Sequence, residues 1–132
     1  MKQITIIFFL SIIFLGCSEM VSLEIPKDEE FTLRTNIDLN TPRSCIIKPD
    51  TEKFEKLLKL LDENNVNWKT EYASIYPRVS VSNSKIHVFF SGNLIVTNLD
   101  KGQYSHKVKE SDYAFLRCEK KPNKYKEINS LP

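Results

Sequence analysis

Glycine is scarce in this 132-residue sequence, which contains only three glycines. The sequence has no glycine-rich phosphate-binding loop and no G-x-S-x-G motif, in which a serine nucleophile stands on a sharp turn. A strong charge of one sign is also lacking, because 19 lysines and arginines are balanced by 17 aspartates and glutamates, for a formal charge of +2. Proteins dedicated to nucleic acid usually carry a much larger basic excess. We therefore expect no phosphate-cradling loop, no serine-hydrolase elbow and no nucleic-acid partner.

Histidine and cysteine are too few and too widely spaced for the usual metal sites. The two histidines, His87 and His106, and the three cysteines show neither CxxC nor HxxxH spacing. His87 lies between Ile86 and Val88, so we expect it on the side opposite their apolar face. Neither histidine has a carboxylate at a spacing that requires pairing. The sequence predicts no enzyme, no cofactor and no bound metal.

No apolar run near the N-terminus is long enough for a membrane-spanning helix. The run from Ile4 to Leu15 is interrupted only by Thr5 and Ser11 and is preceded by Lys2. Twelve helical residues would span roughly 18 Å, whereas the hydrocarbon core of a bilayer is about 30 Å thick. A short apolar run behind a positive charge is typical of a secretory signal peptide. The N-terminus therefore predicts export.

The residues that end this run, Phe14-Leu15-Gly16-Cys17, resemble the lipobox of bacterial prolipoproteins. The resemblance implies that residues 1–16 are a signal peptide removed by signal peptidase II, and that Cys17 is lipidated as the first mature residue. Two or more acyl chains anchor a protein stably. Ser18 resembles the outer-membrane sorting pattern, which implies a bacterial envelope protein held in the bilayer by Cys17, at the outer membrane and facing the periplasm. The alternative is an ordinary secretory signal with a chance cysteine.

Cys45 and Cys118 remain once Cys17 is assigned to lipid, as an even pair in a chain that the signal sends to an oxidising compartment. A disulfide between them is the natural interpretation. It would close a loop of about 73 residues and contribute roughly 4 kcal/mol to stability in the chain-entropy model. Two free buried thiols, or a reactive thiol with His87 or His106 as its base, are the alternatives.

The mature chain divides into three parts. Residues 17–30 mix small, charged and apolar residues around Pro26, which predicts a lipidated tether without fixed structure. Residues 31–118 carry the periodic patterns of one α+β domain. Residues 119–132 form a polar C-terminal tail. Residues 101–132 hold eight basic and four acidic side chains, so this end is either solvated or in contact with an anionic surface.

The clearest periodicity extends from Thr51 to Asn64. Apolar residues at i, i+3, i+4 and i+7 share one helical face, and charged residues fill the remainder. Asp50 is expected to cap the N-terminus of this helix. A domain of this size needs the apolar face for its own core, so we expect the helix to pack against a sheet. The apolar face consists of Phe54, Leu57, Leu58 and Leu61.

Short runs that alternate apolar with polar residues predict β-strands. Turn-forming residues at 82–84, 91–93 and 100–102 recur at intervals of about nine, as in an antiparallel meander. Residues 111–118 fit either a short helix or a buried strand. The sequence thus predicts a small single domain of the α+β class, with one amphipathic helix packed on an antiparallel β-meander and one disulfide. The expected strands lie near residues 29–36, 45–47, 67–73, 79–82, 85–90, 94–98 and 103–108.

Six side chains are candidates for a binding surface. The strand face opposite the helix would display some of them, and the segment before this face adds two tyrosines. Aromatic and arginine side chains are the usual anchors of protein interfaces, although some of these rings are also needed in the core. The candidates are Tyr72, Tyr76, Arg78, Lys85, His87 and Phe89.

An anchor, a short tether, one small disulfide-braced domain and no catalytic motif together predict a non-enzymatic, protein-binding lipoprotein. By analogy with proteins of that build, it would be an inhibitor or immunity protein that acts on another envelope or periplasmic protein. The alternative is a structural or accessory lipoprotein of an envelope assembly or secretion complex, in which the basic C-terminal end matters most. A carrier of a small apolar ligand is less favoured, because so small a core is barely large enough to stay closed.

Overall fold

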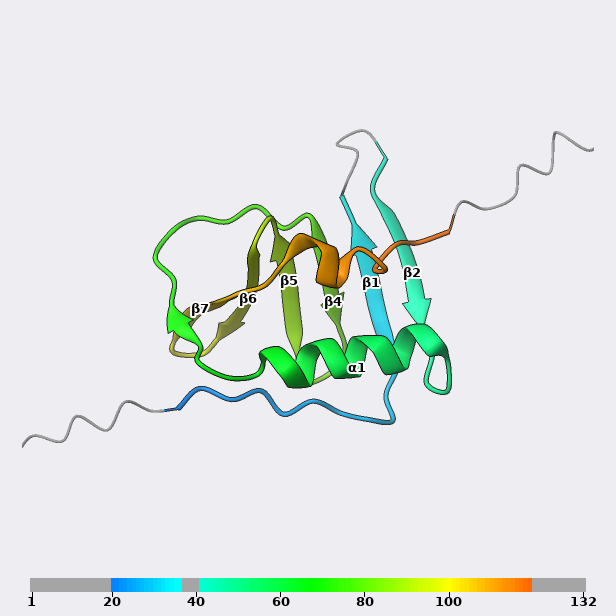
Figure 1. Ribbon diagram of the computed structural model, residues 1–132, viewed down its shortest axis with the longest axis horizontal. Helices are drawn as coiled ribbons and strands as arrows, with labels where there is room; N and C mark the ends of the chain where they lie inside the picture. Colours follow the sequence, from blue (N-terminus) through cyan, green and yellow to red (C-terminus); the bar gives the residue numbers. More distant parts are fainter. Residues whose placement is uncertain (1–19, 37–40, 120–132) are drawn as a thin grey trace, which may run out of the picture.

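Seven short strands and one α-helix are formed by residues 20–36 and 41–119, the part of the chain that the computed structural model describes (Figure 1). The predicted signal peptide, Cys17 and residues 120–132 of the predicted tail lie outside these residues. In chain order the elements are β1 (Phe31–Thr35), β2 (Arg43–Ile47), α1 (Glu52–Asn64), β3 (Lys69–Thr70), β4 (Val79–Ser82), β5 (His87–Ser91), β6 (Leu94–Leu99), β7 (Gly102–Lys107) and a 3-10 helix at Glu110–Tyr113.

The strands form one antiparallel sheet in the order β2-β1-β4-β5-β6-β7-β3. β4 to β7 are the predicted meander. The β1–β2 hairpin joins it at β4, where Leu33 pairs with Val81, and β3 pairs with β7 at the opposite edge. The predicted α+β fold, with one helix on an antiparallel sheet, is therefore confirmed.

The two ends of the strands serve as landmarks below. At the Arg78 end, β4 begins and Gly92 turns β5 into β6. Gly92 has a φ of +53°, which glycine adopts at no steric cost. At the Lys85 end, β4 ends and β6 turns into β7. Asn83 shapes the β4–β5 turn there, because its side-chain oxygen accepts hydrogen bonds from the amides of Lys85 and Ile86, both at 3.0 Å. These bonds delay the start of β5 to His87.

Helix α1 begins one residue later than expected at its cap. Thr51, not Asp50, is the N-cap, and its hydroxyl accepts a hydrogen bond from the Phe54 amide at 3.2 Å. The buried face also differs from the prediction by one residue, because Leu60 is buried and Leu58 is only half-buried. Leu60 is covered by the segment that follows β7, which lies beside the helix. The buried helix residues are Phe54, Leu57, Leu60 and Leu61.

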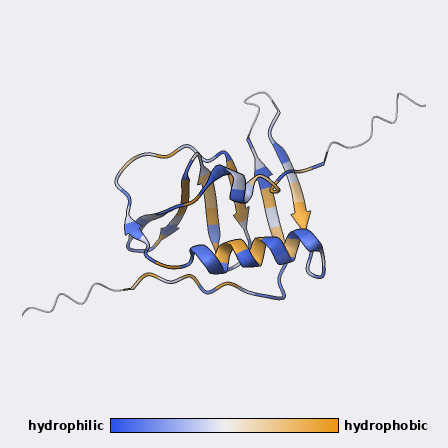
Figure 2. Cartoon of the chain, in the orientation of Figure 1, coloured by the Kyte–Doolittle hydropathy of each residue, from blue (hydrophilic) through white to orange (hydrophobic). Residues whose placement is uncertain are grey.

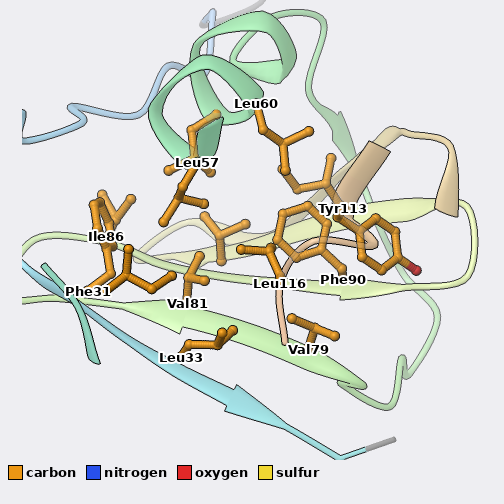
Figure 3. Close-up of a cluster of buried hydrophobic side chains, with 14 of the residues drawn as sticks. Phe31, Leu33, Leu57, Leu60, Val79, Val81, Ile86, Phe90, Tyr113 and Leu116 are labelled. Carbon is orange, nitrogen blue, oxygen red and sulfur yellow. The ribbon is translucent and has the colours of Figure 1, made fainter. Parts of the chain in front are cut away.

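The hydrophobic core lies between the sheet and a layer formed by α1 and residues 108–118 (Figure 1). Figure 2 shows hydrophobic residues along the strands, whereas α1 alternates hydrophobic and hydrophilic positions. Figure 3 shows Leu57 and Leu60 pointing from α1 toward Val81 and Phe90 of the sheet. One helix thus covers only part of the sheet, and residues 108–118 complete the cover.

Residues 111–118, for which a helix and a strand were both open, form neither a full helix nor a strand. The chain makes the short 3-10 helix and then continues irregularly to Cys118. The Tyr113 ring stacks on Phe90 with ring centroids 4.7 Å apart, and its hydroxyl donates to the Gly92 carbonyl at 2.7 Å. Cys118 is joined to Cys45 of β2, so the predicted disulfide is confirmed and fixes the end of this segment to the sheet.

The N-terminal segment is more ordered than the predicted tether. Leu23 is 8% exposed and belongs to the core. Its amide donates to the Asn65 side chain, and its carbonyl accepts from the same side chain, both at 2.8 Å. Further along, both the amide and the hydroxyl of Ser84 donate to Glu29. The expectation that residues up to 30 lack fixed structure is therefore wrong, because the packed domain begins at Leu23.

The face of the sheet turned away from α1 also carries buried residues. Phe89 and Val96 pair across β5 and β6 on this face and are 4% and 0% exposed. Residues 71–78 connect β3 to β4 and are tied to this same face by Gln103 and Ser105. Phe89 was expected to be displayed for binding. That expectation is wrong, because Phe89 forms part of a second, smaller apolar layer.

Candidate functional site

The six predicted binding residues do not form one surface. Arg78 directly precedes β4 and Lys85 follows it, so they lie at opposite ends of a strand of four residues, which is about 13 Å long. Phe89 is buried between the two ends. His87 is exposed next to it at the Lys85 end, with ring centroids 6.3 Å apart. The candidates must therefore be considered as separate groups.

Tyr76 and Arg78 form one group at the Arg78 end. Tyr76 is 59% exposed, and its hydroxyl accepts a hydrogen bond from the Asn36 side chain at 2.9 Å. The Asn36 amide donates to the Arg78 carbonyl at 2.7 Å. Asn36 therefore fixes both residues to the end of β1. An exposed ring whose position is fixed loses little conformational entropy when it binds, which suits a contact residue.

A small cavity of about 150 Å³ lies beside Arg78. Figure 3 shows Val79, Tyr113 and Leu116, which form its apolar floor. Its charged groups are two guanidinium groups, of Arg78 and Arg117, and the Glu110 carboxylate. We call the exposed residues Tyr76, Arg78 and Arg117, with this cavity, the Arg78 surface.

Tyr113 reports the environment of the cavity. Burial raises the pKa of its hydroxyl, the Glu110 carboxylate raises it further, and Arg78 opposes the shift. The phenol is therefore neutral at physiological pH. Its ring lines the cavity, and its hydroxyl donates a hydrogen bond to the Gly92 carbonyl. The guanidinium groups of Arg78 and Arg117 are the positively charged groups at the cavity, and guanidinium groups match carboxylates in a bidentate geometry.

Arg117 was missed by the sequence analysis. No local pattern marks it, because it reaches the cavity only through the path of the segment after β7 and the disulfide at the next residue. Its carbonyl accepts a hydrogen bond from the Lys53 side chain of α1 at 2.8 Å, which also holds this segment in place.

Tyr72 lies apart from the Arg78 surface, at the beginning of the segment 71–78. It follows Glu71, whose amide donates to the Gln103 carbonyl at the start of β7. Tyr72 is 93% exposed. The strand β3 ends at the Lys85 end of the sheet and β4 begins at the Arg78 end. The segment between Tyr72 and Arg78 therefore passes from one end of the strands to the other, and from the β3 edge of the sheet to β4.

The Glu71 carboxylate fastens this crossing segment to the sheet. One oxygen accepts from the Ala73 amide at 3.0 Å, and the other accepts from the Ser105 hydroxyl at 2.9 Å. These two bonds, in that order, hold the pKa of the Glu71 carboxyl below its usual value. Gln103 adds a bond from its side chain to the Ala73 carbonyl at 2.8 Å. This local side-chain bonding also ends β3 after two residues, shorter than predicted.

Acidification is expected to loosen the segment 71–78. A carboxylate with a lowered pKa contributes stability that is present above its unfolded pKa, about 4.3, and is lost as the pH falls through its folded pKa. The NMR signal of the Ala73 amide should shift over this acidic range, and its protection against hydrogen exchange, relative to the intrinsic rate at each pH, should fall several-fold. Glu71→Gln should abolish this titration, whereas the exposed helix variant Glu55→Gln should retain it. An Ala73 amide that titrates equally in Glu71→Gln would contradict this assignment.

Lys85 and the histidines carry no combined site. The Lys85 amine lies 3.5 Å from the Glu24 carboxylate. His106 is half-buried, with its ring 6.3 Å from that of Trp68. Across residues 20–36 and 41–119, no three His, Cys, Asp or Glu side chains gather as metal ligands would.

Comparison of the chain with protein-family models, with curated protein sequences and with solved structures found no match. Within the described residues, no helix has the length and apolar character needed to cross a bilayer.

Proposed function

We propose that this protein is a lipid-anchored envelope protein that binds another protein through the Arg78 surface. The observation that carries the proposal is the pair of arginines, Arg78 and Arg117, that line one small cavity, with the fixed, exposed Tyr76 two positions before Arg78 in the chain. Tyrosine and arginine are enriched among the few residues that supply most of the energy of protein interfaces. The partner is a protein of the envelope or periplasm that presents a carboxylate to the cavity.

The lipobox-like residues Phe14-Leu15-Gly16-Cys17 support the anchorage. The disulfide supports export as well, because such bonds persist in oxidising compartments and are rare in the cytosol. The Arg78 surface lies at the end of the strands opposite the turn that holds Glu29 of the N-terminal segment. An anchor at one end and a binding surface at the other are what an inhibitor or immunity protein of the envelope requires.

A domain of this size that binds tightly is expected to bury about 800 Å² of its own surface. The cavity alone is too small for that area. It serves as the central pocket for one side chain of the partner, while Tyr76 and its surroundings supply the rest. This arrangement favours recognition of a protein over recognition of a small ligand, because a cavity of about 150 Å³ is below the usual size of small-molecule sites.

Substitution of the anchors tests the proposal. Cells that carry the chain with a C-terminal tag are crosslinked, and the captured proteins are quantified by mass spectrometry. Tyr76→Ser and Arg78→Ala are each expected to reduce one dominant partner at least about tenfold, as loss of a major contact does. Ile46→Ser is the matched control, because Ile46 is 47% exposed and lies on β2 near the other end of the strands.

Cys17→Ala separates anchorage from binding in the same experiment. This variant is expected to leave the membrane fraction and to lose the lipid-modified N-terminal peptide. Equal capture by wild type, Tyr76→Ser and Arg78→Ala would remove the basis for the Arg78 surface. A set of captured proteins dominated by subunits of one envelope assembly would favour the accessory role instead.

A further inference from the structure

Exposed apolar side chains gather at one corner of the domain, at the Lys85 end and beside β7 and β3. Met20 and Tyr72 are 94% and 93% exposed, and Val66 and Leu99 are 50% and 40% exposed. Isolated exposed apolar residues are ordinary, but a group of them marks a contact surface. We call these four residues the apolar corner.

One shared groove, together with the hydrogen bonds of neighbouring residues, places the members of the apolar corner. Met20 and Leu99 line one open groove of about 590 Å³, with Tyr104 of β7. Val66 follows Asn65, the residue whose side chain holds Leu23. Figure 1 shows the N-terminal segment ending on the same side of the molecule as β7 and β3.

Tyr72 joins the corner from the other side of β7. It follows Glu71, whose amide donates at 2.8 Å to the carbonyl of Gln103, the second residue of β7. Gly102, at the start of β7, pairs with Leu99. The backbone therefore brings Tyr72 to the β6–β7 turn that carries Leu99.

The length of the chain between Cys17 and the domain restricts what can cover this corner. Met20 lies three positions after Cys17, and an extended chain spans at most about 3.6 Å per residue, so the chain allows at most about 11 Å between the two. Leu23 is fixed in the core, six residues from Cys17. The acyl chains on Cys17 are thus confined to the neighbourhood of the apolar corner.

We propose that the apolar corner rests on the bilayer surface and orients the domain. The inference depends on the proposed lipidation of Cys17 and adds a contact surface to it. Transfer of apolar side chains out of water lowers the free energy, and tyrosine favours the membrane interface. The anchor raises their effective concentration at the bilayer, so weak contacts suffice. Charged side chains border this contact, because Lys85, which is paired with Glu24, and Asp100 and Lys101 also line the groove.

This orientation has a consequence for the Arg78 surface. Arg78 lies at the other end of the strands from the corner, so a domain seated on Met20 and Leu99 would hold its binding surface away from the lipid headgroups. The domain would then keep one orientation relative to the bilayer.

Two positions on one strand provide a matched test. Asn93 precedes β6 and Asn98 lies near its end, about 16 Å away at the rise of a β-strand. Asn93→Cys and Asn98→Cys variants of the full chain, lipidated by the cells that make it, are labelled with an environment-sensitive fluorophore while the native disulfide stays oxidised. They are placed in vesicles of phosphatidylethanolamine and phosphatidylglycerol that contain a nitroxide-labelled lipid. Quenching at position 98 is expected to be at least about threefold stronger than at 93, because contact quenching is short-ranged compared with this spacing.

A second comparison tests the side chains themselves. Met20→Ser combined with Leu99→Ser should reduce quenching at position 98 toward the level at 93. Ile46→Ser should leave it unchanged, because β2 lies five strand spacings from β7, about 24 Å away.

Several results would overturn the proposal. Equal quenching at 93 and 98 would mean that the domain tumbles freely on its link. Unchanged quenching after the Met20 and Leu99 substitutions would exclude their contact with lipid. Protection of position 98 from a soluble quencher without quenching by the nitroxide lipid would show that protein, such as a second copy, covers the corner. The mass of the N-terminal peptide distinguishes these failures from a failure of lipidation at Cys17, which would remove the proposed anchorage and this bilayer contact but not the proposed binding by the Arg78 surface.

Discussion

Replacing both Cys45 and Cys118 with alanine is expected to lower the free energy of unfolding by about 4 kcal/mol. The bond joins residues 73 positions apart, and the chain-entropy model gives this value for a loop of that length. Natural domains are stable by only about 5–15 kcal/mol, so the loss is a large share of the total. For a domain of this size it corresponds to a fall in the melting temperature on the order of 20 °C.

Calorimetry of the oxidised protein and of the double variant measures this loss. Reduction of the wild-type protein is the control, since it opens the same bond without changing a side chain, and it should give the same melting temperature as the variant. A fall of only a few degrees in both samples would show that packing, not the crosslink, holds residues 108–118 on the sheet.

The disulfide also bears on the proposed binding surface. Arg117 directly precedes Cys118 and lines the cavity beside Arg78. Loss of the bond leaves the Lys53 hydrogen bond and the packing of Leu116 to hold Arg117 in place. The crosslink therefore helps to position a residue of the proposed binding surface in addition to stabilising the fold.

Leu57→Ala is expected to destabilise the domain by about 3–5 kcal/mol, while the adjacent Leu58→Ala should cost about 1 kcal/mol. Leu57 is 0% exposed and lies at the centre of the helix face that contacts the sheet. Its truncation loses buried apolar area and leaves a cavity. Leu58 is half-buried at the border of this face, so its truncated site is partly filled by water.

Urea unfolding of the two variants measures the difference. The pair is matched, because both replace the same side chain on neighbouring positions of one helix, with equal changes in helix propensity. Equal losses of stability would contradict the assignment of Leu57 to the centre of the face and Leu58 to its border.

The local patterns of the sequence predicted most elements of the fold. The helix from Glu52 to Asn64 has a strong amphipathic period, and the strands of the meander alternate between turn residues at regular spacing. These signals depend only on neighbours along the chain. The disulfide could be inferred too, because a cysteine pair in an exported domain has few other uses.

Local sequence patterns do not predict burial where distant segments decide a residue's environment. Leu60 is buried because residues after β7 lie beside α1, and Phe89 is buried on a face that was expected to meet solvent. Likewise, Leu23 joins the core through Asn65, which lies 42 positions away. No periodicity within a short window reports such contacts.

The candidate site was predicted only in part, for the same reason. Tyr76 and Arg78 were named as candidate binding residues by their type. Their connection through Asn36, and the contribution of Arg117 from the far end of the chain, depend on the order of strands in the sheet. That order places β1 between β2 and β4, although 43 residues separate the end of β1 from the start of β4 in sequence.

The position of Cys118 at the end of the core has a consequence for the order in which the domain can form. A chain is made from its N-terminus at about 5–20 residues per second, so β1 and β2 exist for some seconds before β4, and Cys45 waits longer still for its partner. Tyr113 and Leu116, which complete the cover of the sheet, emerge just before Cys118. The chain as far as Cys118 must therefore be synthesised before the core can close. Until then the apolar face of the growing sheet stays exposed to solvent. The domain can fold only after its last few residues have been made.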